Sequence, residues 1–129
     1  MNIPDQLKFT ESNEWINVER NEGTIGISDY AQDQLSDIVF AEIIVNEGDH
    51  IKKGDTIATI ESVKAAADVY SPVSGKVISV NESLAGTPEV INHDPYGAAW
   101  IIKVELSDPS ELDALLTSTA YEEYIKKLQ

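Results

Sequence analysis

The sequence has no cysteine and only two histidines among its 129 residues. Without cysteine it has no disulfide, no thiolate metal ligand and no cysteine nucleophile. The two histidines, His50 and His93, are isolated in the chain and cannot form a histidine-rich metal site alone. A glycine-rich phosphate loop with the Gly-Lys-Ser/Thr ending is also missing. We therefore predict no metal site and no catalytic residues.

Long apolar runs are absent as well. No segment approaches the roughly 20 apolar residues that a membrane-spanning helix needs. The opening segment, MNIPDQLKFT, has neither the basic nor the apolar region of a secretory signal peptide. We expect a cytoplasmic protein that does not enter a membrane.

Basic residues are few. Nine lysines and arginines stand against 23 aspartates and glutamates, which gives a formal net charge of −14. Such a surface repels phosphate backbones, so nucleic acid binding is not expected. It attracts partner proteins that carry basic patches, and it also keeps a small protein soluble. Charge alone does not separate these two roles.

The chain does contain a series of short β-strand patterns. Its length suits one compact domain, expected to span 1–129. Apolar patterns bounded by turn residues predict strands at 15–20, 24–27, 38–45, 56–61, 68–70, 76–80 and 100–106. Strands this short and closely spaced predict a mainly β fold, either a small sandwich or a flattened barrel.

Helical patterns are confined to a short internal segment and the C-terminus. Ser28 is positioned to cap a helix over 29–35. The segment 108–111 (DPSE) forms a capping box, and a second box starts at Thr119. We expect two C-terminal helices, over about 108–128, to cover an edge or an end of the β core.

One lysine stands out between two turn signals. Lys64 is the only basic residue between Gly54 and Gly75. The strand patterns on either side have similar lengths, so antiparallel pairing would place Lys64 at the tip of a hairpin over about 54–75. Such a lysine is accessible to a modifying enzyme, although an ordinary loop lysine fits the same geometry. At Gly75, in the turn after the second arm, we expect a positive φ.

The residues around this lysine resemble a known family. The segment ESVKAAADVYSPVSG at 61–75 resembles the lipoyl-lysine segment of the glycine cleavage system H protein family. The likeness continues in the family's order through NEW at 13–15, GTIGISDYAQDQL at 23–35, DIVFAEI at 37–43 and INHDPYG at 91–97. It covers essentially the whole chain, including an N-terminal hairpin and C-terminal helices that simple lipoyl domains lack.

The resemblance implies a fold and a role. The fold would be the lipoyl/biotinyl type of flattened barrel-sandwich, with the N-terminal hairpin and C-terminal helices packed on it. Lys64 would carry lipoate in amide linkage, attached by a lipoate ligase or a lipoyl/octanoyl transferase. The protein would be a non-catalytic carrier of the aminomethyl group of glycine, from the glycine decarboxylase P protein to the aminomethyltransferase T protein. It would pass electrons to the dihydrolipoamide dehydrogenase L protein.

The resemblance also implies a cleft that shelters the loaded arm. Three positions match the family pattern there: Ser12, Glu14 and Asp68. The two carboxylates would hold the amine of the aminomethyl group, with Ser12 as a neutral acceptor. Without the resemblance, both acids are typical of a solvated surface.

Some positions depart from the family's usual pattern. Asn13 and Tyr30 stand where the family usually has histidine, and Ser36 stands where it usually has glycine. The usual E-L-P-E-x-G becomes EIIVNEG at 42–48, which loses the proline and gains one residue. None of these changes affects Lys64, and they bear on the details of the cleft.

Other carriers share part of the pattern. A biotin carrier usually places its lysine between two methionines, which Val63 and Ala65 do not match. A lipoyl domain of a 2-oxoacid dehydrogenase is normally shorter and often adjoins a Pro/Ala linker, which is not found here. An H-like lipoylated protein that donates lipoate to other enzymes stays open as the alternative function, because of the departures at Asn13, Tyr30 and Ser36. An independent enzyme is the least expected.

Overall fold

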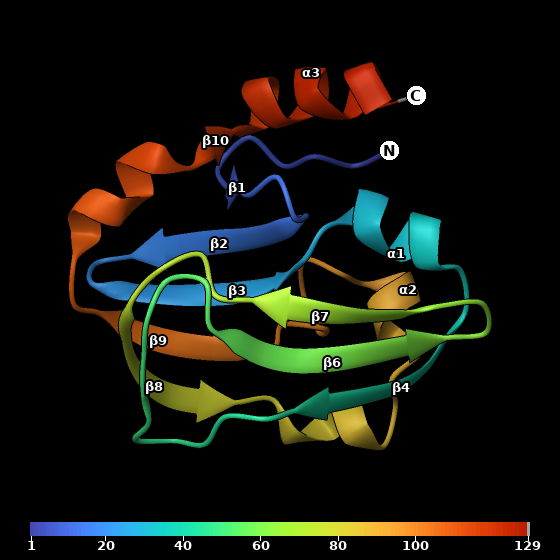
Figure 1. Ribbon diagram of the computed structural model, residues 1–129, viewed down its shortest axis with the longest axis horizontal. Coiled ribbons are helices and arrows are strands. Elements are labelled where there is room, and N and C mark those ends of the chain that lie inside the picture. Colours follow the sequence, from blue (N-terminus) through green and yellow to red (C-terminus); the bar gives the residue numbers. More distant parts are fainter. Residues whose placement is uncertain (129) are drawn as a thin grey trace.

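The computed structural model describes residues 1–128 and consists mainly of β-strands (Figure 1). The strands are β1 (Lys8–Phe9), β2 (Glu14–Glu19), β3 (Glu22–Ile27), β4 (Ile38–Ile43), β5 (His50–Ile51), β6 (Thr56–Ser62), β7 (Ala66–Tyr70), β8 (Gly75–Val80), β9 (Ile102–Leu106) and β10 (Leu116–Thr117). One sheet has seven strands in the order β10-β1-β2-β3-β9-β8-β5, and the other has three in the order β4-β6-β7. Within residues 1–128 the two sheets share no strand and do not close into a barrel, so the fold is a sandwich.

Short helices occupy the ends of the sandwich. They are α1 (Asp29–Leu35), the 3-10 helix η1 (Glu82–Ala85), α2 (Val90–His93), the 3-10 helix η2 (Pro109–Ala114) and α3 (Ser118–Leu128). Ser28 caps α1, because its hydroxyl accepts a hydrogen bond from the N–H of Ala31 at 3.1 Å. In Figure 1, α1 lies near the tip of the β6–β7 hairpin, and α3 lies across the N-terminal segment. Among residues 1–128, no helix combines the length and apolar composition needed to span a membrane.

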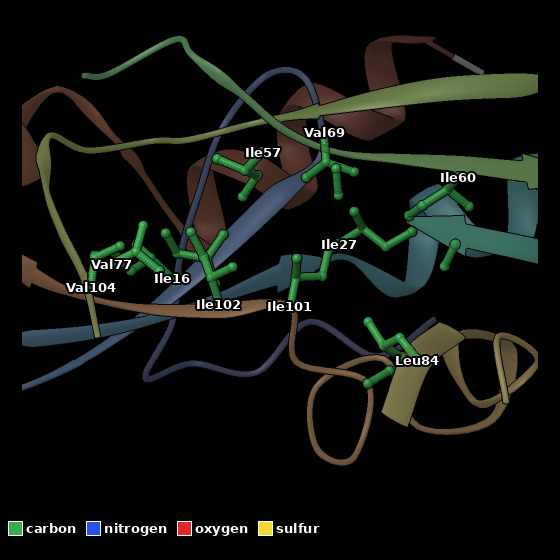
Figure 2. Close-up of a cluster of buried hydrophobic side chains, with 14 of the residues drawn as sticks. Ile16, Ile27, Ile57, Ile60, Val69, Val77, Leu84, Ile101, Ile102 and Val104 are labelled. Atoms are coloured by element: carbon green, nitrogen blue, oxygen red, sulfur yellow. The ribbon is translucent and has the colours of Figure 1, made fainter. Parts of the chain in front are cut away.

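Branched aliphatic side chains fill the space between the sheets. Figure 2 shows Ile57, Ile60 and Val69 of the smaller sheet facing Ile27 and Ile102 of the larger one. All five are buried, and burial of each such side chain contributes about 1.5–3 kcal/mol. Because Ile57, Ile60 and Val69 come from β6 and β7, this packing fixes both strands of the hairpin that carries Lys64.

A separate aromatic core joins the N-terminal segment to α3. The rings of Phe9 and Tyr121 are stacked, with centroids 4.4 Å apart, and Tyr96 meets Phe9 edge-on at 6.4 Å. The indole N–H of Trp15 donates to the carbonyl of Pro95 at 3.0 Å. Aromatic pairs contribute about 0.5–1.5 kcal/mol beyond the area they bury. The hairpin of β2 and β3 lies inside the larger sheet, between β1 and β9, and β10 adds to β1.

The C-terminal segment differs from the two expected α-helices. Its first part is the 3-10 helix η2, and the short strand β10 separates this from α3. The carboxylate of Glu111 does not fold back on its own cap. It accepts hydrogen bonds from the N–H and the hydroxyl of Ser74, at 2.6 and 2.8 Å. The last helix begins at Ser118, where Thr117 Oγ1 accepts from the N–H of Ala120 at 3.2 Å.

The prediction of a positive φ at Gly75 is wrong. Among the glycines of residues 1–128, positive φ occurs at Gly48 and Gly54. A Cβ placed on Gly75 would clash with the carbonyl oxygen of Glu105. Glycine is therefore required here because the backbone of β9 approaches closely, and no turn geometry requires it.

Candidate functional site

The structure places Lys64 at the tip of the β6–β7 hairpin, with its side chain exposed. The strands pair antiparallel up to Glu61 opposite Ala66. Ser62 organises the turn, because its Oγ accepts hydrogen bonds from the N–H groups of Lys64 and Ala65 at 3.2 and 3.0 Å. The ion pair found in residues 1–128 joins Lys126 to Glu122, so the Lys64 amine is engaged with no carboxylate in that part of the chain.

The tip is also tied to the neighbouring strand. The N–H of Val63 donates to the carbonyl of Asp37 at 3.0 Å, and Ile38 pairs with Ser62. The backbone beside Lys64 is therefore hydrogen-bonded to β7 on one side and to the residues at the start of β4 on the other. Such a tip presents a lysine at a defined place on the surface.

A cleft of about 180 Å³ lies along β7, the strand that follows Lys64. Its walls come from the loop before β2 and the first residue of that strand, from α1 and from β7, and Ile27 of β3 and Ile60 of β6 also line it. The lining includes Ser12, Asn13 and Glu14 on the first wall, Ala31 and Leu35 on the second, and Asp68 and Val69 on the third. The fold thus brings Ser12, Glu14 and Asp68 to one cleft, although Asp68 is distant from the other two in sequence.

Glu14 is buried, with 1% of its surface exposed. Its Oε1 accepts from the hydroxyls of Thr10 and Ser12 at 2.5 and 2.6 Å, and its Oε2 accepts from the N–H of Tyr70 at 3.2 Å. All three donors are neutral, and no cation pairs with this carboxylate within residues 1–128. An ammonium group entering the cleft would therefore gain a charge-assisted hydrogen bond with an uncompensated carboxylate. The interpretation of Glu14 as a solvated surface acid, which its local sequence alone favours, is therefore wrong.

The same carboxylate links the two sheets. Glu14 begins β2 in the larger sheet, whereas Tyr70 ends β7 at an edge of the smaller one. The hydrogen bond from the Tyr70 N–H to Glu14 therefore satisfies a backbone donor of an edge strand and closes one side of the cleft.

Ser12 and Asp68 occupy more open positions. Both are exposed, and Asp68 lies on β7 opposite Thr59. The Ser12 hydroxyl donates its hydrogen bond to Glu14, so its oxygen is left to accept a hydrogen bond from another donor. The structure therefore gives the cleft one buried carboxylate, one exposed carboxylate at its rim and one hydroxyl acceptor.

The departures from the family pattern have local explanations. Asn13 has a φ of 74°, a left-handed conformation in which asparagine is enriched. Ser36 also has a positive φ of 67°, where glycine would be less strained. Tyr30 is buried in the aromatic core. Of the three, only Asn13 lines the cleft.

Sequence reasoning missed the side chain that holds Asn13. The hydroxyl of Tyr121, in α3, donates to Asn13 Oδ1 at 2.8 Å and lies 2.6 Å from Ser28 Oγ. Burial raises the pKa of the Tyr121 phenol well above its usual value, with the charge of Glu14 a smaller contribution in the same direction. The spacing of apolar residues in α3 indicates a core position for this ring and gives no sign of its hydroxyl contacts.

Exposed apolar side chains gather on the smaller sheet and its hairpin tip. They are Val39, Phe40, Ile44, Val63 and Tyr70. The other large apolar side chains that are exposed within residues 1–128 are Met1 and Leu128, near the chain ends. Exposed carboxylates, including Glu42 and Glu61, share this sheet. Grouped apolar side chains on an otherwise polar surface are typical of contact sites for other proteins.

No metal site is found among residues 1–128, where no three potential metal ligands of the His, Cys, Asp or Glu type come together. His50 and His93 are both exposed.

Comparisons with known proteins agree with the geometry. Residues 7–128 match the family model described as Glycine cleavage H-protein. The glycine cleavage system H protein of Carboxydothermus hydrogenoformans is 50% identical over 125 residues, which are 97% of this chain and 95% of that protein. The one from Coprothermobacter proteolyticus is 51% identical over 126 residues, 97% and 98% of the two chains.

A solved structure shows the same fold. The crystal structure of a glycine cleavage system H protein from Mycobacterium marinum matches with a TM-score of 0.82 and 30% identity, and the match covers 97% of this chain and 98% of that one. The predicted sandwich of the lipoyl-domain type is thereby confirmed. This chain belongs to the glycine cleavage H-protein family, and it is a carrier component of that system with no catalytic activity of its own.

Proposed function

We propose that this protein carries lipoate in amide linkage on Lys64 and moves the aminomethyl group of glycine from the P protein to the T protein. Electrons would pass from the arm to the L protein. The observation that carries the proposal is the exposed lysine at the hairpin tip, beside a cleft that contains a buried carboxylate with no cation. The chain would act as a single carrier domain in the cytoplasm.

The residues present fit such an arm. The Lys64 amine is exposed and is followed by three alanines, which leave space for an acylating enzyme. When bound, the arm supplies a dithiolane, a two-electron redox couple that this cysteine-free chain lacks. Apolar residues such as Ile60, Leu35 and Val69 line the cleft and suit its hydrocarbon part.

The cleft also suits the cargo. An aminomethyl group carries an amine, and Glu14 offers it a carboxylate shielded from water. Ser12 offers a second acceptor, and Asp68 adds negative charge at the rim. By excluding water, such walls would slow hydrolysis of the loaded arm between one partner and the next.

The surface supports visits by several partners. The net charge of −14 attracts proteins with basic patches, and acylation of Lys64 would remove one positive charge from it. The exposed apolar side chains on the smaller sheet lie on the same layer as the hairpin tip. The partners would be the P, T and L proteins and the lipoate ligase or lipoyl/octanoyl transferase.

The direct experiment is an intact-mass measurement on protein from its native host, followed by peptide mapping. A lipoyl group should be found on the peptide that contains Lys64. Lys53 lies in an exposed turn and serves as the control, because Lys53→Arg should leave the mass addition unchanged. A lipoyl group on another lysine would overturn the assignment.

The second candidate is an H-like protein that donates lipoate to other enzymes. The absence of histidine from positions 13 and 30 favours it, because Asn13 lines the cleft. The two functions separate when the lipoylated protein is supplied to P and T proteins with glycine. Turnover supports the carrier, whereas lipoate transfer without turnover supports the donor.

A further inference from the structure

The geometry points to Tyr121 as a positioning residue for the cleft: its hydroxyl holds the wall that carries Ser12, Asn13 and Glu14 in place against α1. This inference rests on the proposed function, because it concerns the cleft that would shelter the loaded arm. Tyr121 lies in α3 and does not line the cleft. It would act only through Asn13.

The hydrogen bonds around Tyr121 have one consistent direction. Asn13 Oδ1 can only accept, so the single proton of the Tyr121 hydroxyl is donated to it at 2.8 Å. The Ser28 hydroxyl, 2.6 Å away, must then donate to the Tyr121 oxygen. Ser28 Oγ in turn accepts from the N–H of Ala31. Consecutive hydrogen bonds therefore run in one direction from the first turn of α1, through the Tyr121 hydroxyl in α3, to the cleft residue Asn13.

This series of hydrogen bonds joins two walls of the cleft. Ala31 belongs to the α1 wall, and Asn13 belongs to the loop wall. The loop has its own internal bonds, in which the N–H of Asn13 donates to Thr10 and the N–H of Thr10 donates to Glu14. Among the hydrogen bonds of residues 1–128, Asn13 is joined to the start of α1 by the Ser28 N–H, which donates to the Asn13 carbonyl at 2.9 Å, and by the Tyr121 hydroxyl. Removing the hydroxyl therefore leaves the backbone contact beside the β2–β3 pairing and frees the Asn13 amide to rotate.

Tyr121 is suited to hold a fixed position. Its side chain is fully buried, and its ring stacks on Phe9 with an interplanar angle of 2°. Because burial keeps the phenol protonated, it can donate throughout the working range of pH. The ring is anchored independently of the hydroxyl, so a phenylalanine at this position would keep the packing and lose only the two hydrogen bonds.

The consequence for the cleft follows from what the loop carries. Thr10 and Ser12, which hold Oε1 of Glu14, belong to the same loop as Asn13. Glu14 itself begins β2 and pairs with Ile27, so a movement of the loop relative to α1 would shift the Ser12 acceptor and the two hydroxyls that orient the carboxylate. In a cleft of about 180 Å³, such a shift changes the fit of the arm.

The test compares Tyr121→Phe with Tyr96→Phe. Tyr96 is a matched control, because its ring packs in the same aromatic core and its hydroxyl also makes two hydrogen bonds, accepting from the Asp29 N–H and donating to the Asn2 carbonyl. It has no hydrogen bond to the loop that carries Asn13. We expect the loaded arm of Tyr121→Phe to hydrolyse about fivefold faster than that of wild type, the factor corresponding to one neutral hydrogen bond. Tyr96→Phe should match wild type.

A double substitution shows whether the effect passes through Asn13. Asn13→Gly removes the amide but allows the positive φ. In this background, Tyr121→Phe should have no further effect on the lifetime of the loaded arm, as expected for two residues that act as a unit. A full effect in the Asn13→Gly background would overturn the inference, as would equal acceleration by Tyr96→Phe.

A measurement on the unlipoylated protein makes the inference independent of loading. Amide hydrogen exchange at Ser28, whose N–H is bonded to the Asn13 carbonyl, should accelerate in Tyr121→Phe and stay unchanged in Tyr96→Phe. Unchanged exchange in both variants would overturn the positioning role. If exchange responds as expected but the wild-type protein is never lipoylated, the proposed function fails and the positioning of the loop stands.

Discussion

Replacing Glu14 by glutamine should shorten the lifetime of the loaded arm by about 10- to 150-fold. The carboxylate is 1% exposed, and within residues 1–128 it pairs with no cation, so solvent screens its contact with an ammonium group only weakly. A charge-assisted hydrogen bond in such a place contributes roughly 1.5–3 kcal/mol. Since each 1.4 kcal/mol or so is a factor of ten, the lifetime should fall within the stated range.

The Glu14→Gln substitution should also lower the free energy of unfolding, because its amide fits the hydrogen-bond donors around it poorly. The N–H of Tyr70 can only donate, so the glutamine oxygen must face it and the amide nitrogen must face the hydroxyls of Thr10 and Ser12. Those hydroxyls now lie 2.5 and 2.6 Å from Oε1, which is shorter than the usual 2.7–3.2 Å of an N–H···O hydrogen bond. The site must therefore expand, and we expect the free energy of unfolding to fall by about 1–3 kcal/mol.

The assay follows the loaded protein after its partners are removed, by release of formaldehyde and ammonia. Lipoylation of Glu14→Gln should be normal, because Lys64 lies in the turn between β6 and β7, away from β2. Asp68→Asn provides a comparison, since this carboxylate is exposed and such pairs contribute about 0.2–1 kcal/mol, or at most about fivefold in lifetime. Equal lifetimes for wild type and Glu14→Gln would show that the Glu14 carboxylate does not hold the amine of the loaded arm. A larger effect from Asp68→Asn would show that the buried carboxylate is not the main holder.

Three further predictions concern the attachment site, the hairpin and the surface. Lys64→Arg should fold and carry no lipoyl group, because a guanidinium is a poor acyl acceptor; a lipoyl mass on this variant would contradict it. Gly75→Ala should lower the free energy of unfolding, measured by denaturant titration, by about 1–3 kcal/mol, because its Cβ would clash with the Glu105 carbonyl oxygen. Gly86→Ala, where the nearest atom lies 3.9 Å away, should change little, and equal losses would exclude close approach as the cause. Association with the P protein should weaken as ionic strength rises from low to physiological, and a flat profile would mean that the charge of −14 serves solubility alone.

The sequence predicts those features of this fold that depend on neighbouring residues. The alternation in β9, the cap at Ser28 and the turns that place Lys64 at a tip are all local patterns. Features that depend on distant partners were not predictable. Gly75 is required by Glu105, and Glu111 bonds to Ser74 in place of its own helix.

The candidate site also depends on contacts between residues that are far apart in the sequence. Ser12, Glu14 and Asp68 were identified by resemblance, since nothing in their local patterns distinguishes them from surface residues. Glu14 is buried, and its carboxylate accepts a hydrogen bond from the N–H of Tyr70, 56 residues away in the chain, which no local pattern shows. The role inferred for Tyr121 depends on a contact with Asn13 across 108 residues. The short strands β1 and β10 have two residues each, too few for any periodicity to show.

The arrangement around Glu14 suits a carrier, which has to hold its cargo and also release it. A carboxylate offers about four acceptor positions, and Thr10, Ser12 and Tyr70 occupy three of them. These neutral donors fix the orientation of the carboxylate without neutralising its charge, whereas a lysine or arginine partner would have removed its attraction for an amine. One acceptor position is then left over, and under the proposed function the amine of the cargo would occupy it. A single charge-assisted hydrogen bond, roughly 1.5–3 kcal/mol, would favour the sheltered arm by one to two orders of magnitude, and a partner protein that offers comparable contacts would reverse that preference.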